Sequence, residues 1–257
     1  VSSGAQYVSG QTRLEHDLLG DRYVSSEMYY GVQTMRAVEN FNISGVTLSF
    51  YPVLIHGLAI VKMASALANY DLGLMDKNVT DAIVMACSEI MNGKWHRHFV
   101  VDMVQGGAGT STNMNANEVI ANRALEILGY NKGEYEHCHP NNHVNLSQST
   151  NDAYPTAVKL AILYSNITLV ETLKDLIDSF HKKAKEFDQV IKMGRTQLQD
   201  AVPMTLGQEF EAYAVTLGEE IDRLEQNVQL FLEVNMGATA IGTGINSEPG
   251  YSEKCIH

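Results

Sequence analysis

Apolar residues recur every three or four positions between residue 51 and Gly129, which is the spacing of one face of an α-helix. Asp76 is a suitable N-cap for a helix whose apolar positions follow it, and Gly93 ends that run. A further helix is expected to begin near Ser111 and to end at Gly129. The pattern in this part of the chain therefore predicts a compact group of helices.

Two longer helices are predicted in the second half of the chain. The first starts near Asn151 and continues to Phe187, so at 1.5 Å per residue it would be roughly 50 Å long. The second starts with a capping-box pattern, Thr205 followed by Gln208, and continues to Val234. The apolar stripes consist of Leu163, Ile167, Val170, Leu173, Ile177, Phe180, Ala184 and Phe187 in the first helix, and of Leu206, Phe210, Tyr213, Leu217, Ile221, Leu224, Val228, Phe231 and Val234 in the second.

Two helices of this length cannot cover both stripes by packing only on each other. We therefore expect an all-α protein: a small helical N-terminal domain, residues 1–146, followed by the first part of a central bundle of long helices, residues 147–257. Other subunits or a further part of the protein would supply the missing helices. The residues from Asn246 onward resemble a turn into another helix, so the C-terminal part of the bundle is expected to lie outside this sequence.

The charge balance narrows the classes of partner. With 18 Lys and Arg against 30 Asp and Glu, the formal charge is −12, which disfavours binding to nucleic acid or to an anionic membrane surface. An anionic ligand must then be bound by local dipoles and individual cations. The cysteines are odd in number and far apart, which argues against a disulfide framework and favours the reducing cytoplasm: Cys87, Cys138 and Cys255.

No signal peptide or membrane span is predicted. Residues 1–13 are polar, and the most apolar stretch, Val53–Ala68, contains His56 and Lys62.

Three polar segments interrupt the helical pattern. The first, Gln105–Asn113, is rich in glycine and precedes a helix, so its backbone N–H groups suit a carboxylate or a phosphate; an ordinary glycine turn with a Ser or Thr cap is the alternative. The second, Ser147–Asp152, offers more hydroxyl and amide groups than one N-cap needs. The third, Gly194–Asp200, leads into the second long helix and is either functional or a simple connector.

Taken together, these segments resemble the active-site regions of the fumarase/aspartase superfamily. The matching residues are Gly109-Thr110-Ser111 with Asn113, Gln148-Ser149-Thr150-Asn151-Asp152, and Gly194-Arg195-Thr196-Gln197. The segments Tyr29–Thr34 and Gly237–Gly244 also resemble this family, so the likeness spans nearly the whole chain. The forms of the first two segments are more similar to aspartate ammonia-lyases than to fumarases.

The resemblance implies a homotetramer joined through its long helices, with each active site formed by residues of three subunits. It implies a dicarboxylate substrate, L-aspartate, which loses ammonia to give fumarate without a cofactor. The substrate-binding residues that it implies are Thr110, Ser111, Asn113, Ser149, Thr150, Asn151, Thr196 and Gln197. Among them Thr110, Ser149 and Thr150 would hold the β-carboxylate, and Asn151, Thr196 and Gln197 would lie near the amino group.

Two other functions stay open on the sequence alone. A fumarate hydratase shares the fold and much of the site, whereas a catalytically silent helical scaffold would need only the oligomeric surface. Fumarases, like some aspartate ammonia-lyases, have a titratable His at the position that matches Gln197, so the amide is compatible with ammonia loss and less so with loss of water. The family's third signature, a mobile loop that supplies the general base, has no match in these residues, so the catalytic base is not assigned.

A histidine-rich segment offers two further hypotheses. His137, Cys138, His139 and His143 together suggest a zinc site, but no second Cys/His pair stands at ligand spacing, so no metal is expected. By resemblance His139, Asn141 and Asn142 belong instead to a secondary anion site, although Asn142 stands where an acidic residue is common. His96 and His98, which follow a helix end in a polar stretch, are expected to face solvent.

Overall fold

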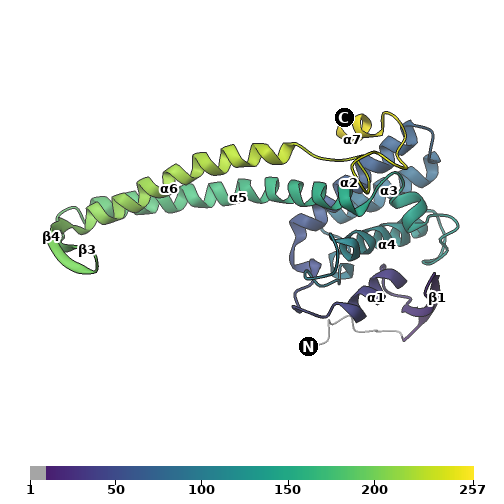
Figure 1. Ribbon diagram of the computed structural model, residues 1–257. Helices are drawn as coiled ribbons and strands as arrows, with labels where there is room; N and C mark the ends of the chain where they lie inside the picture. The colour runs from purple at the N-terminus through teal and green to yellow at the C-terminus, as the bar shows by residue number, and fades with distance from the viewer. Residues whose placement is uncertain (1–9) are drawn as a thin grey trace. The chain divides into compact units, whose positions relative to one another are not determined.

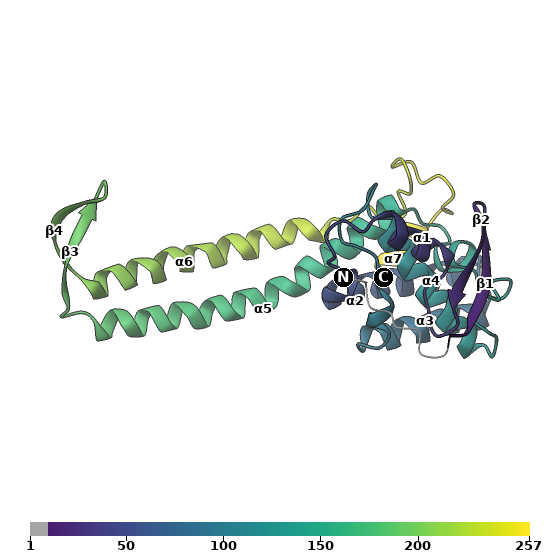
Figure 2. The same ribbon diagram turned by 90° about the horizontal axis from the view of Figure 1, so that it is seen from below.

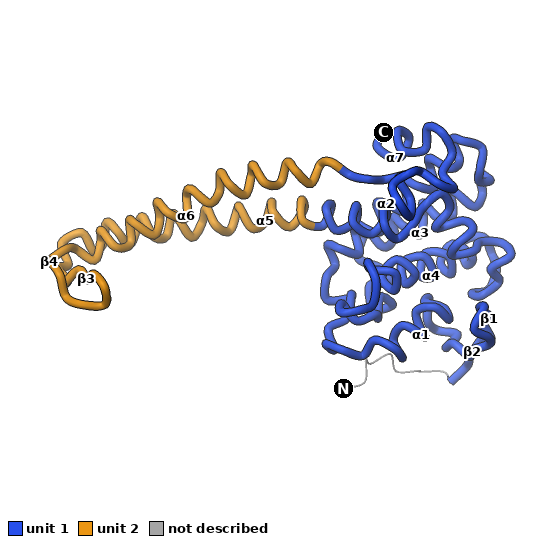
Figure 3. The backbone as a smooth tube through the Cα atoms, viewed as in Figure 1, with its two compact units in different colours: residues 1–161, 234–257 blue, residues 162–233 orange. Residues whose placement is uncertain are grey.

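The computed structural model describes residues 10–257, which divide into two compact units. Unit 1 contains the residues up to 161 together with residues 234–257, and unit 2 contains residues 162–233 (Figure 3). The helix α5 (Thr150–Glu186) contributes its first residues to unit 1 and the rest to unit 2. The predicted domain boundary between residues 146 and 147 refers to the domains of the whole protein and not to these compact units. It stays a prediction.

Unit 1 is built on three helices that lie side by side (Figures 1 and 2): α2 (Pro52–Asp71), α3 (Lys77–Met91) and α4 (Thr110–Ile127). The short helix α1 (Val32–Asn40) packs on α4, and α7 (Tyr251–Ile256) packs on α2. The core between them contains side chains that are almost completely buried, such as Leu48, Ile55, Leu58, Ile83, Ile90, Ile120 and Leu125. The predicted helical first part of the chain is thus confirmed, including the N-cap position of Asp76.

Close approach of α2 to the start of α5 depends on Gly57. A Cβ atom at this position would lie 2.5 Å from the carbonyl oxygen of Ala157, which is far inside van der Waals contact. The two backbones can therefore pack at this distance only because residue 57 has no side chain.

Helix α2 is also the one helix, among the described residues, that is long and apolar enough to cross a membrane. Of its most apolar window, 61% is buried inside the protein, as is typical of a core helix.

Three short helical segments connect these elements: η1 (Leu48–Phe50), η2 (His96–His98) and the π-helical turn η3 (Pro140–Val144). At η2 the structure contradicts the sequence analysis. His98 is 1% exposed and packs against Tyr29, and His96 is half-buried with its Nε2 2.8 Å from the Ile90 carbonyl oxygen. The expectation that both face solvent was wrong, because the chain turns inward after the left-handed residue Trp95 (φ 67°).

An antiparallel hairpin, β1 (Thr12–Asp17) and β2 (Gly20–Ser25), lies beside α1 and was not predicted. In β1 the buried residue is Glu15, so the strand lacks the apolar alternation by which strands are recognised. Polar contacts fasten it instead: the Arg13 guanidinium donates to the carbonyl oxygens of Ser25, Met28 and Tyr30 at 2.7–2.8 Å.

Unit 2 consists of the remainder of α5, the hairpin β3 (Ile191–Thr196) and β4 (Gln199–Thr205), the helix α6 (Leu206–Gln229) and the turn η4 (Leu230–Leu232). Both long helices and the capping box at Thr205 and Gln208 are confirmed. The helices contact each other through aromatic rings, such as Phe180 and Phe210 with centroids 5.8 Å apart. Large apolar side chains nevertheless stay exposed on both helices, among them Ile162, Ile167, Leu169, Leu176 and Val215.

Candidate active site

The glycine-rich segment ends at the first turn of α4. Gly109 is the N-cap residue and has a left-handed backbone (φ 86°); a Cβ atom there would lie 2.5 Å from the Tyr154 ring of α5. Gln105 fixes the turn, because its Oε1 accepts from the Thr112 N–H at 3.0 Å and its Nε2 donates to the Asp102 carbonyl at 2.9 Å. Thr110, the first residue of α4, is left exposed at the positive end of the helix dipole.

The second polar segment caps α5. The Ser149 hydroxyl oxygen accepts from the Asn151 N–H at 3.2 Å, and Asp152 Oδ1 accepts from the Ser149 N–H at 2.9 Å. This reciprocal pair follows the logic of a capping box, so one serine is enough to satisfy the helix end. Thr150 is half-buried beside this cap.

The two helix N-termini are joined by side chains as well as by the Gly109–Tyr154 packing. The Asn113 amide nitrogen lies 3.3 Å from Thr150 Oγ1 and 3.0 Å from Asn145 Oδ1. Asn113 is 1% exposed, so its amide lies behind the surface on which Thr110 and Thr150 stand. Of the residues predicted in the first two segments, the structure thus brings Asn113 into contact with Thr150.

Lys62 of α2 lies at the centre of this junction. Its side chain is fully buried, and its Nζ donates to Asn113 Oδ1 at 2.7 Å, Asn145 Oδ1 at 2.9 Å and Gln148 Oε1 at 2.7 Å. Burial lowers the pKa of Lys62 to about 7, and the Asp152 carboxylate counteracts that shift. In the sequence Lys62 stands out only as an interruption of an apolar stretch, and a cation within a core helix is a signal that a polar partner lies nearby.

The segment 235–240 closes over the first turn of α5. Asp152 is completely buried, and its Oδ2 accepts from the N–H groups of Gly237 at 3.1 Å and Thr239 at 2.9 Å. The Asn151 amide donates to the Ala240 carbonyl at 2.8 Å. The resemblance found in Gly237–Gly244 therefore corresponds to a segment in contact with Ser149–Asp152.

Thr196 and Gln197 belong to unit 2 and lie at the tip of the hairpin β3–β4. Thr196 pairs with Gln199 across the tip, and Gln197 and Leu198 form the turn with φ 50° and 63°. Both turn residues are exposed, and Leu198 is 100% exposed. These two residues thus belong to a different compact unit from Thr110, Ser149 and Thr150.

The histidine-rich segment is held by its own backbone. His139 Nδ1 accepts from the N–H groups of Asn141 at 3.0 Å and Asn142 at 3.3 Å, and His143 Nδ1 accepts from the His139 N–H at 2.8 Å. His137 stacks on the Tyr130 ring with centroids 3.6 Å apart. Over residues 10–257 no group of three or more His, Cys, Asp or Glu side chains could hold a metal ion. The secondary anion site stays a prediction, and such an anion would compete with His139 for two N–H groups.

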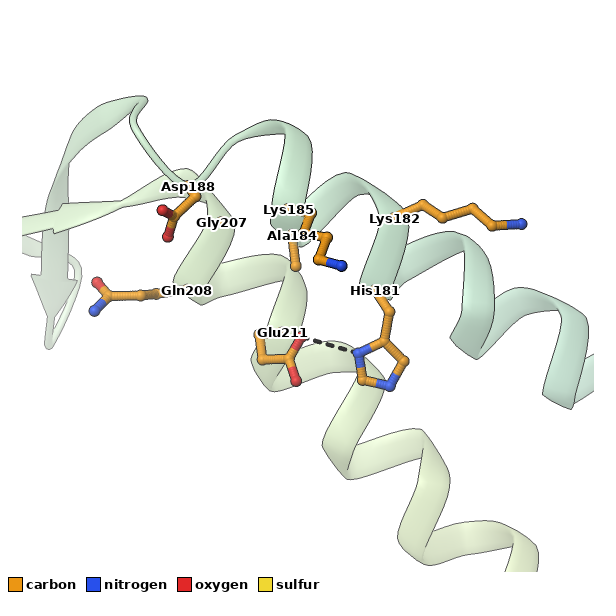
Figure 4. A pocket seen from close by; sticks show the side chains of 8 residues that line it. All are labelled: His181, Lys182, Ala184, Lys185, Asp188, Gly207, Gln208 and Glu211. Atoms are coloured by element: carbon orange, nitrogen blue, oxygen red, sulfur yellow. Dashed lines mark hydrogen bonds and ion pairs between the residues drawn. The ribbon is translucent and has the colours of Figure 1, made fainter.

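Two pockets are lined by residues other than those that join α4 to α5. One, of about 320 Å³ in unit 1, is lined by His139 and Asn141 together with His16, Asp17 and the buried Glu118 among others. The other, of about 610 Å³ in unit 2, surrounds His181, whose Nδ1 lies 2.9 Å from Glu211 (Figure 4). Its other lining residues are Lys182, Ala184, Lys185, Asp188, Gly207 and Gln208.

Comparison with known proteins assigns the chain to a class of lyases. The sequence model of the lyase family matches residues 20–257, so this chain belongs to that family. It is 58% identical over 246 residues to the aspartate ammonia-lyase of Pseudomonas aeruginosa, covering 95% of this chain and 52% of the relative. It is 53% identical over 250 residues to the aspartate ammonia-lyase of Escherichia coli, covering 97% of this chain and 52% of the relative.

Solved structures of related proteins have a similar fold. The fumarate lyase:delta crystallin from Brucella melitensis is 56% identical with a TM-score of 0.91, and the match covers 95% of this chain and 53% of the other. The class II fumarase from Schistosoma mansoni is 39% identical with a TM-score of 0.85, covering 95% and 51%. The chain spans about half the length of the relatives that it matches.

Proposed function

We propose that the whole protein eliminates ammonia from L-aspartate to give fumarate. The observation that carries this proposal is the junction of two helix N-termini: Thr110 at the start of α4, and Ser149 and Thr150 at the start of α5, with the buried Lys62 behind them. Helix N-termini and a buried cation favour binding of an anionic ligand at this place. The overall charge of −12 alone would repel such a ligand.

In this reaction the proton leaves Cβ, and negative charge develops on the β-carboxylate as an aci-carboxylate. We assign Thr110, Ser149 and Thr150 as donors to that group. Donors fixed in advance stabilise charge that develops in the transition state, and loss of one costs on the order of 10²–10³ in rate. Ser111 and Asn113 complete this part of the site, Asn113 from behind the surface.

We assign Asn151, Thr196 and Gln197 to the neighbourhood of the amino group. Asn151 is oriented for this by its hydrogen bond to the Ala240 carbonyl. Thr196 and Gln197 stand at an exposed hairpin tip, where residues of one subunit can reach the site of another. The general base is not assigned to any residue of this chain.

Fumarate hydration is the second candidate, because a class II fumarase shares the fold at 39% identity. The identity to the aspartate ammonia-lyases, 53–59%, is higher. Loss of hydroxide from malate needs a proton donor near the leaving oxygen, whereas the ammonium group of aspartate already carries its proton. Gln197 is an amide that does not titrate near neutral pH, which favours ammonia loss.

The proposal includes a homotetramer built on the long helices, since exposed apolar side chains on α5 and α6 need cover. The three free cysteines support placement in the reducing cytoplasm.

The direct test is product stoichiometry with the full-length protein. Incubation with L-aspartate should release fumarate, followed by ultraviolet absorbance, and ammonia, measured by a coupled assay, in equal amounts. Release of neither product would refute the proposal.

A further inference from the structure

The hydrogen bonds around Lys62 have a fixed direction. An ammonium group has three N–H donors and no acceptor, and Lys62 Nζ faces three amide oxygens at 2.7–2.9 Å, those of Asn113, Asn145 and Gln148. A neutral amine would leave its lone pair facing one of these oxygens. The contacts are therefore satisfied completely only when Lys62 is protonated.

The donor role of Lys62 fixes the orientation of the Asn113 amide. Because the ammonium can only donate, the amide oxygen of Asn113 must face Lys62, and the amide nitrogen must point away from it. That nitrogen lies 3.3 Å from Thr150 Oγ1 and 3.0 Å from Asn145 Oδ1, which are both acceptors for it. The charge on Lys62 thus selects which end of the Asn113 amide meets Thr150.

The orientation of the Asn113 amide in turn fixes the hydrogen-bonding role of the Thr150 hydroxyl. A threonine hydroxyl has one hydrogen, and when its oxygen accepts from Asn113 that hydrogen points elsewhere. Thr150 is the first residue of α5, so no earlier turn of this helix offers it a carbonyl oxygen. Thr150 is half-buried, whereas Asn113 and Lys62 are buried behind it, so its hydrogen points to the open side.

We propose that Lys62 is a positioning residue that, through the Asn113 amide, fixes the Thr150 hydroxyl as a hydrogen-bond donor to the substrate carboxylate. This inference rests on the proposed function only in taking a dicarboxylate as the ligand. It assigns Lys62 and Asn113 a role in ligand binding that differs from packing, because it depends on donor direction and not on volume.

The variant Asn113→Asp separates direction from packing. The carboxylate keeps the shape of the amide and accepts from Lys62, but it cannot donate to Thr150, whose hydroxyl hydrogen should turn toward it. In the full-length protein we expect the affinity for succinate, a dicarboxylate that cannot react, and kcat/KM for L-aspartate to fall about 100-fold. The charged partner that Lys62 gains should offset part of the stability lost where the new carboxylate oxygen meets Asn145 Oδ1, so succinate affinity is measured per folded molecule.

A control variant and a double variant test whether the effect of Asn113→Asp acts through Thr150. Asn115→Asp also places a carboxylate inside α4, but Asn115 is bonded to the Val100 N–H and the His98 carbonyl, so succinate affinity per folded molecule should change less than about threefold. If Asn113 acts through Thr150, adding Asn113→Asp to Thr150→Ala should lower succinate affinity by less than about threefold more. Independent contributions would multiply to roughly 10⁴-fold.

Unchanged succinate affinity in Asn113→Asp, or multiplying losses in the double variant, would overturn the inference. A wild-type protein that binds succinate but forms no fumarate from L-aspartate would reject the proposed reaction. The succinate affinities of the variants would still decide the inference about Lys62. A wild-type protein that binds no succinate would overturn both.

Discussion

At the scale of single residues, His98 makes a prediction about acid stability. The imidazole is buried against Tyr29, and burial together with the neighbouring Arg97 lowers its pKa to about 4. The unfolded chain has a histidine pKa near 6.5, so between pH 6.5 and 4 it binds more protons than the folded protein. The contribution of His98 to stability is therefore complete above pH 6.5 and is lost as the pH falls toward 4.

The measurement compares wild-type protein with His98→Gln, which does not titrate. Between pH 7 and pH 4 the difference between their free energies of unfolding should shift against the wild type by about 3 kcal/mol. The difference between the two proteins isolates His98 from Glu118, whose pKa is raised by burial to about 7 and which changes stability in the opposite sense. A difference that is constant over this pH range would contradict the burial of His98.

The sequence directs attention to the exposed and half-buried polar residues of the candidate site, but not to those buried behind them. Thr110, Ser149 and Thr150 stand in segments with more polar groups than a helix cap needs. Lys62 lies far from those segments in the sequence, and only the packing of α2 against α4 and the start of α5 brings its Nζ to Asn113 and Asn145. A local pattern carries no information about which distant residue satisfies a buried amide.

At the scale of secondary structure, the start of α5 contains a proline in the helix and a compensating side chain. Pro155 has no N–H to donate to the Asn151 carbonyl four residues earlier. That carbonyl instead accepts from the Asn235 amide at 3.0 Å. Asn235→Ala should therefore cost about 0.5–1.5 kcal/mol in unfolding free energy, because an exposed carbonyl exchanges its amide partner for water.

The same contact predicts coupling between the two positions. In a Pro155→Ala background the new N–H can bind the Asn151 carbonyl, so Asn235→Ala should cost less than half as much. Chemical denaturation of the four proteins of this cycle measures the coupling. Equal costs in both backgrounds would show that Asn235 does not compensate for the proline.

The long helices could be predicted because their apolar residues keep a period near 3.6 over many turns and because Thr205 and Gln208 form a recognisable cap. The hairpin β3–β4 could not. Its two-residue turn is Gln197-Leu198, with φ 50° and 63°, where Asn or Gly is the usual signal. The sequence of the turn itself therefore gives no hairpin signal.

At the scale of the whole molecule, the apolar surface of unit 2 predicts assembly. Ile167 is 58% exposed and Leu169 52% exposed on α5, and Val215 is 53% exposed on α6. Sedimentation of the full-length protein should give a homotetramer. Replacing Ile167 and Leu169 together by Glu should dissociate it, because burial of charge in an apolar interface is unfavourable. A stable wild-type monomer would contradict this prediction.

The central claim is that the site serves ammonia elimination from aspartate, and the choice of substrate tests it most directly. Fumarate formation by the full-length enzyme can be followed by ultraviolet absorbance with L-aspartate and with L-malate under the same conditions. The account predicts that kcat/KM for L-aspartate is at least a hundredfold higher, equal to about 2.7 kcal/mol of transition-state preference. Equal or greater efficiency with L-malate would contradict it.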